Sequence, residues 1–115
     1  MRNKPTRFYS SQQEKEVAKV VNGKQQSNSG AGTWQKGDVK SKEFLIECKT
    51  HTKVQKSTTI EKEWLEKIRE ESFGMRKNYY ALAFDFGPDT NRWYIISEQL
   101  FKKLNEFLEE EDEEK

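Results

Sequence analysis

The chain has 115 residues, the length of one ordinary domain, so no second enzymatic module is expected. Hydrophobic residues make up 32% of the sequence and charged residues 36%, which predicts a small core without a large buried pocket. The net charge of +1, with 7 Phe, 4 Tyr and 3 Trp residues, still favours a folded domain over a disordered chain.

The spacing of apolar residues and turn residues predicts eight elements. Apolar residues three or four apart indicate helices, and short apolar runs bounded by turn residues indicate strands. We therefore expect an α/β fold, with a central mixed β-sheet of about five strands flanked by helices in the order α-β-β-β-α-β-β-α. The expected elements are a helix from Ser10 or Ser11 to Asn22, a loop or short edge strand at 24–33, two strands within 34–50 with a turn near 40–42, a helix at about 60–72, a buried strand at 79–86, its antiparallel partner within 92–97 and a helix at about 98–108.

The C-terminal end combines an amphipathic helix with a run of acids. The apolar side chains of the last predicted helix are expected to point into the core, and they are Leu100, Phe101, Leu104, Phe107 and Leu108. Residues 1–108 are predicted to form a single domain, and residues 109–115 an acidic disordered tail. The alternative interpretation is regulatory: a tethered anionic segment would compete with DNA for basic side chains.

Charge is distributed unevenly along the chain. Residues 1–80 contain 17 Lys/Arg and 10 Asp/Glu, whereas residues 81–115 contain 4 and 10. A basic body favours phosphate-bearing partners such as nucleic acid, and ordinary solvated lysines are the alternative.

The counts of Cys and His limit the possible chemistry. Cys48 is the single cysteine and His51 the single histidine, so neither an internal disulfide nor a zinc cluster is expected. A nucleophilic triad would need His51, and catalysis is more simply assigned to carboxylates, lysines and a metal that prefers oxygen ligands. Without an apolar stretch of ~18 residues or a secretory signal, we expect a cytoplasmic protein that makes no membrane contact.

The segment that carries chemistry has Asp38 followed, nine residues later, by Glu47 and Lys49. Side chains alternate in a strand, so residues 44, 46 and 48 are expected to face the core and residues 45, 47 and 49 the other side. A preceding hairpin strand would bring Asp38 beside Glu47. Two adjacent carboxylates repel each other, so this arrangement favours a divalent cation such as Mg²⁺ between them. Lys49 would then stabilise charge on a phosphoryl group.

These residues resemble the PD-(D/E)XK nucleases, and among them the small archaeal-type Holliday junction resolvases and their phage-borne relatives. GDV followed by FLIECKT supplies the Asp, the spacer and the Glu-x-Lys within an apolar strand, and the helix QEKEVAKVV and the loop NSGAG precede it in the same order. The resemblance covers roughly residues 10–97, with Gly37 standing where the family name implies proline. It implies a restriction-endonuclease-like core and a metal-dependent endodeoxyribonuclease for branched DNA. It also implies Mg²⁺ (or Mn²⁺ as a substitute), a homodimer, and the host cytoplasm if the chain is phage-encoded.

The resemblance also implies roles for individual residues. Asp38 and Glu47 correspond to metal ligands, the Cys48 backbone carbonyl to a further ligand, and Lys49 to the catalytic lysine. The intact trio of Asp38, Glu47 and Lys49 argues against the alternative function, a non-catalytic nucleic-acid-binding module that retains the nuclease fold.

Other candidates lie outside this segment. The family's helical glutamate corresponds to Glu14 or Glu16, and Glu14 is favoured because it shares a helix face with Val17 and Val21, which should pack on the sheet. Ser29 matches the serine of the family's Ser-Gly loop and is either a phosphate contact or a turn residue. The lysines closest to the candidate site are the expected phosphate contacts, and they are Lys36, Lys53 and Lys56.

Overall fold

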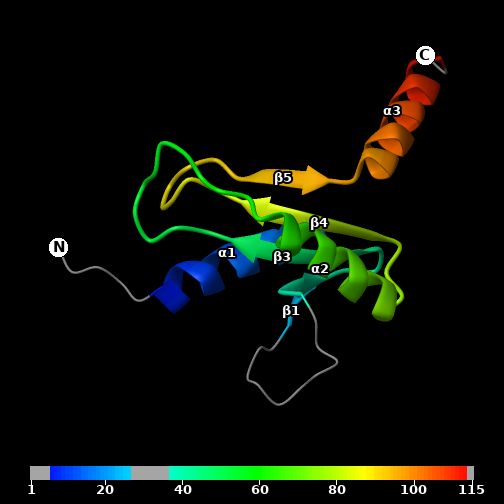
Figure 1. Cartoon of the computed structure of the whole chain (residues 1–115). Coiled ribbons are helices and arrows are strands. Elements are labelled where there is room, and N and C mark those ends of the chain that lie inside the picture. The colour runs from blue at the N-terminus through cyan, green and yellow to red at the C-terminus, as the bar shows by residue number, and fades with distance from the viewer. Residues whose placement is uncertain (1–5, 27–36, 114–115) are drawn as a thin grey trace.

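A computed structural model describes residues 6–26 and 37–113. The chain is an α/β protein, and the predicted order of elements is confirmed (Figure 1). The first helix begins at Thr6, earlier than the Ser10 or Ser11 expected from the sequence. The elements are α1 (Thr6–Val20), β1 (Lys24–Gln25), β2 (Val39–Lys40), β3 (Phe44–Lys49), α2 (Lys62–Gly74), β4 (Tyr79–Phe84), β5 (Trp93–Ile96) and α3 (Glu98–Glu113).

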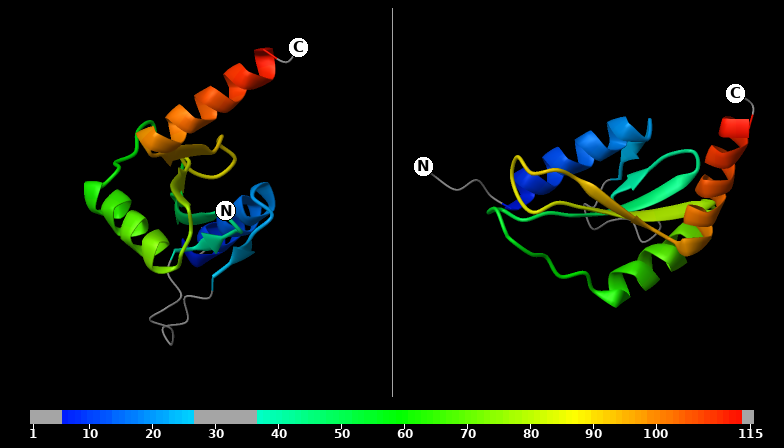
Figure 2. Two further views of the ribbon diagram at one scale, coloured as in Figure 1. Left: turned by 90° about the vertical axis from the view of Figure 1, so that its right-hand side faces the viewer. Right: turned by 90° about the horizontal axis from the view of Figure 1, so that it is seen from above.

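The five strands form one mixed sheet in the order β1-β2-β3-β4-β5. Only β3 and β4 are parallel, and α2 makes the crossover that connects them, whereas the other neighbours are antiparallel. The predicted turn before β3 is closed by Ser41, whose N–H donates to the Phe44 carbonyl and whose hydroxyl accepts the Phe44 N–H. Helices α1 and α2 lie on opposite faces of the sheet (Figure 2).

Both faces of β3 are buried, which corrects the expectation of a core on one face only. Ile46 packs with Val17 of α1, and Leu45 on the opposite face is fully buried where α2 contacts β3. The sequence pattern did not reveal this because the crossover helix covers the face that a single amphipathic strand would leave open. Glu47 and Lys49, which share the Leu45 face, are therefore partly buried and do not project into solvent.

Helix α3 does not pack inward, so that prediction is wrong. None of its residues is buried, and the helix leads away from the sheet beyond β5 (Figures 1 and 2). The Ser97 hydroxyl accepts the Leu100 N–H at 3.1 Å and starts the helix at the end of β5. Helix α1 packs on β1, β2 and β3 and helix α2 on β3 and β4, whereas β5 keeps Trp93 and Tyr94 exposed, so α3 leaves the sheet at an edge without a packed helical layer for it to join. The helix also continues through Glu113, into the segment for which the sequence predicts a disordered tail.

None of the helices in residues 6–26 and 37–113 is long and apolar enough to cross a membrane.

Candidate functional site

The register of β2 and β3 brings Asp38 opposite Glu47. Val39 pairs with Ile46 in an antiparallel ladder, so the preceding residue, Asp38, comes next to Glu47. The Asp38 N–H donates to the Ile46 carbonyl at 2.9 Å. The Asp38 carboxylate accepts the Cys48 N–H at 2.8 Å, so this side chain replaces the backbone carbonyl that would accept the next hydrogen bond between the two strands. The pair of carboxylates predicted from the spacing is therefore assembled at the end of β3.

Gly37 shows why proline does not stand before the aspartate. Its φ is +71°, a left-handed conformation that the proline ring does not allow. Its N–H also donates to the Glu71 carboxylate at 3.1 Å, a bond that proline cannot make. A Cβ at this position would lie 2.7 Å from the Leu45 side chain. The backbone conformation and the hydrogen bond at position 37 therefore explain why glycine stands where the family name implies proline.

Glu47 lies beside a lysine and a second carboxylate. Its carboxylate is 3.4 Å from Lys49 Nζ, and the two side chains are 18% and 35% exposed. Burial and the neighbouring Asp38 together raise the pKa of Glu47 to about 7, although Lys49 opposes both effects. The negative charge of this pair is therefore only partly compensated by protein groups, which is the electrostatic setting that attracts a cation.

Residues of α1 and α2 both contact Lys49. Its ammonium lies 4.3 Å from the centroid of the Trp64 ring of α2, and its backbone carbonyl accepts the Gln13 side-chain amide of α1 at 2.8 Å. Gln13 is buried and also donates to Asp85, which follows β4. Trp64 falls in the helix that the sequence predicts at about 60–72, and neither Gln13 nor Asp85 stands out in the sequence. The contacts of all three depend on how the helices cross the sheet.

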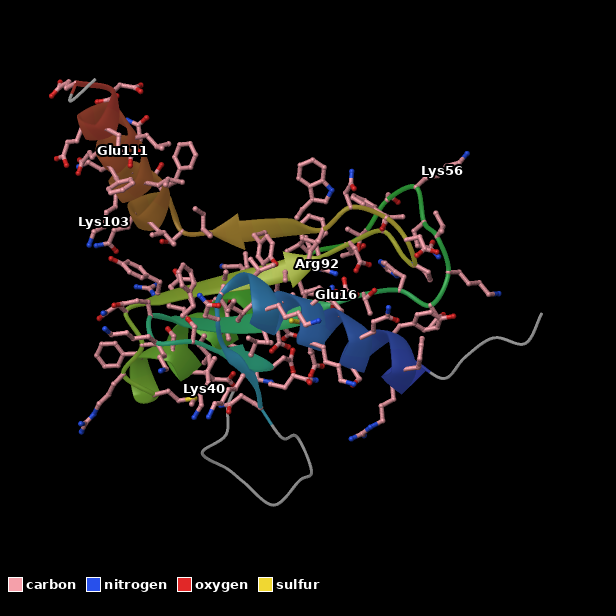
Figure 3. All side chains as sticks on the ribbon, turned by 180° about the vertical axis from the view of Figure 1, so that it is seen from behind. Glu16, Lys40, Lys56, Arg92, Lys103 and Glu111 are labelled. Carbon is pink, nitrogen blue, oxygen red and sulfur yellow. The ribbon has the colours of Figure 1, made fainter. Side chains whose placement is uncertain are left out.

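Glu14 and Glu16 have different surroundings. Glu14 is partly buried, and burial and the neighbouring Asp38 raise its pKa. Glu16 instead forms an ion pair with Arg92 at 2.6 Å (Figure 3). This arrangement favours Glu14 as the helical carboxylate near Asp38.

The candidate phosphate contacts are only partly described. Lys53 and Lys56 are exposed in the loop between β3 and α2, and Lys56 points outward in Figure 3. Ser29 and Lys36 lie outside the described residues. A cavity of about 350 Å³ opens beside Lys49, where His51 Nε2 lies 2.8 Å from the Thr58 hydroxyl. Half of its lining residues carry a hydroxyl group, and the full lining consists of Lys49, Thr50, His51, Gln55, Ser57, Thr58, Thr59 and Trp64.

The donor groups suit magnesium better than a softer metal. Within the described ranges, no three His, Cys, Asp or Glu side chains lie close enough together to hold a metal ion. Mg²⁺ is commonly bound by only one or two carboxylates, with waters and substrate phosphates completing its coordination. Asp38 and Glu47 meet that requirement. Burial raises the pKa of the Cys48 thiol, so this sulfur stays protonated and is not a ligand.

No family model matches the sequence, and comparisons with curated proteins and with solved structures found no match. The motif and the arrangement of side chains at the end of β3 are therefore what indicates a function.

Proposed function

We propose that this chain is a metal-dependent endodeoxyribonuclease of the PD-(D/E)XK type, similar to Holliday junction resolvases. The observation that carries the proposal is the convergence of Asp38, Glu47 and Lys49 at the end of β3. Glu47 and Lys49 are 3.4 Å apart, and the Glu47 pKa is raised to about 7 by burial and by Asp38. A partly buried carboxylate pair with an adjacent ammonium suits phosphoryl chemistry, in which cations offset the negative charge of substrate and transition state.

The proposed roles follow from these positions. Asp38 and Glu47 would hold Mg²⁺ or Mn²⁺, with the Cys48 backbone carbonyl as a further ligand. Glu14 does not form a cluster of three ligands with them, and it would act through the charge that it places near Asp38. When bound, the ion would polarise the scissile phosphate and neutralise part of its charge. Lys49 would stabilise the charge that develops on the phosphoryl oxygens.

The surroundings of Lys49 limit where its ammonium can go. The Glu47 carboxylate and the Trp64 ring contact it from two directions, and Gln13 fixes the backbone behind it. Such restraint is what preorganised electrostatic catalysis requires.

DNA is proposed as the substrate because positive charge is concentrated in the part of the chain that bears the site. Residues 1–80 contain 17 Lys/Arg against 10 Asp/Glu, and a basic body attracts the phosphate backbone. Ser29, Lys36, Lys53 and Lys56 are the proposed phosphate contacts. A non-catalytic DNA-binding module is the second candidate, and the observation in its favour is that the excess of Lys and Arg in residues 1–80 would attract the phosphate backbone without any cleavage.

The experiment compares cleavage of DNA in Mg²⁺ by the wild type, Asp38→Asn, Lys49→Ala and the control Lys42→Ala. Lys42 is an exposed lysine in the turn before β3, so the control removes the same charge away from the site. We expect the two site variants to lose at least about 100-fold in rate and to retain their fold by circular dichroism and most of their DNA affinity. The control should keep full activity. Full activity in either site variant would contradict the proposal, and a wild type that binds DNA without cutting it would favour the second candidate.

A further inference from the structure

Helix α3 carries an exposed apolar stripe. Leu104 is 44% exposed and Phe107 56%, and Phe101 and Leu108 are 62% and 49% exposed. These four residues and Leu100 are three or four positions apart, so they lie along one side of the helix. None of the α3 residues is buried, and the helix that carries the stripe leads away from the sheet (Figures 1 and 2).

The stripe has the size of an interaction surface. Four large side chains at these exposures present roughly 400–500 Å² of mainly apolar surface, which is at the upper end for a monomer. Pairing two such stripes would bury roughly 900 Å² before the stems of the flanking lysines and glutamates are counted. That area lies between most crystal contacts and stable interfaces, and it suits a reversible dimer.

The charges along α3 identify the partner and its direction. The first half of the helix holds Lys102 and Lys103 against one acidic residue, Glu98, whereas the second half holds six acidic residues and no basic one: Glu106, Glu109, Glu110, Glu111, Asp112 and Glu113. In an antiparallel pair the basic half of each helix lies beside the acidic half of the other. A parallel pair would place all the acidic residues together, where they repel.

The direction of α3 relative to the sheet is compatible with the antiparallel pair. The helix leaves the body at β5 and points away from it (Figure 2), and its 16 residues span about 24 Å. Two antiparallel helices therefore keep the two bodies at opposite ends of the pair.

We propose that two copies of this chain associate through antiparallel pairing of their α3 helices, centred near Leu104. The family resemblance implies a homodimer but not its interface. The proposed contact specifies which surface forms the dimer and how the two copies are oriented. This dimer does not depend on the proposed nuclease activity, because the contact is made by α3 and not by the residues at the end of β3.

The first test measures the mass of the full chain by sedimentation equilibrium from about 5 to about 500 µM. We expect a monomer–dimer equilibrium for the wild type. Leu104→Glu should raise the dissociation constant at least about 100-fold, because a symmetric dimer loses two buried leucines. Phe73→Glu is the matched control, since Phe73 is 86% exposed on α2 and lies outside the stripe, and it should dimerise like the wild type. Circular dichroism checks that both variants remain folded.

A wild type that remains monomeric over this range would overturn the proposal and leave the stripe for a different partner. So would a dimer that survives Leu104→Glu.

The second test determines the helix direction by disulfide cross-linking in a Cys48→Ala background. Leu104→Cys should cross-link to itself, because the pair is centred there. Glu111→Cys should not cross-link to itself but should cross-link to Ser97→Cys when the two variants are mixed. Self-linking of Glu111→Cys would show a parallel pair and overturn the proposed arrangement.

Discussion

The raised pKa of Glu47 makes the stability of the protein depend on pH in a defined direction. The ordinary pKa is 4.5 and the folded-state value is about 7, so the folded protein binds more protons than the unfolded chain between these values. The resulting stabilisation is fully present below pH 4.5 and is lost as the pH rises through about 7. A shift of this size corresponds to roughly 3 kcal/mol of unfolding free energy.

Glu47→Gln keeps the shape of the side chain and removes its charge. At about pH 8.5, in EDTA, we expect the variant to be more stable than the wild type, with a free energy of unfolding that is larger by up to about 3 kcal/mol. At about pH 4 the two proteins should differ little, because Glu47 is then protonated in the wild type. Urea denaturation followed by circular dichroism at several pH values measures both quantities.

The matched control for this experiment is Glu66→Gln, which removes an exposed carboxylate from α2. It should show no comparable gain at high pH. Added Mg²⁺ should stabilise the wild type at about pH 8.5, since a cation that binds only the folded state adds to its stability, and it should stabilise Glu47→Gln much less. An equal stability of wild type and Glu47→Gln at high pH, or a gain that is the same at both pH values, would refute the reasoning about this carboxylate.

Two further predictions concern residues near the site and the loops beside it. Glu14→Gln should lower the cleavage rate strongly and Glu16→Gln hardly at all, because only Glu14 lies near Asp38; steady-state rates on one DNA substrate measure this, and the reverse ranking would contradict it. Gly87→Ala should lower the unfolding free energy by about 2–4 kcal/mol, because φ is +118° and a Cβ would lie 2.6 Å from a backbone oxygen of the loop before α2. Gly74→Ala, with open space around it, should raise that free energy by up to about 1 kcal/mol; urea denaturation of both variants checks the contrast.

The local patterns that predicted the fold and the carboxylate pair are strong in this sequence. The apolar run ending in Glu47 and Lys49 is short, is bounded by polar residues and alternates, and the spacing back to Asp38 matches a tight hairpin. The outward path of α3 was not predictable, because periodicity identifies an apolar helix face but not what covers it. The contacts of Lys49 with Trp64 and Gln13 were also not predictable, since they depend on the crossing of α1 and α2 over opposite faces of the sheet.

The central claim is that the end of β3 forms a metal-dependent site for hydrolysis of DNA. The most direct measurement incubates the wild-type protein with a four-way junction, a matched duplex and single-stranded DNA, each in Mg²⁺, Mn²⁺ or EDTA, and resolves the products on denaturing gels. We predict cleavage with either metal, no cleavage in EDTA, and a preference for the junction. Absence of cleavage in every divalent metal, or cleavage that persists in EDTA, would contradict the assignment of Asp38, Glu47 and Lys49 to such a site.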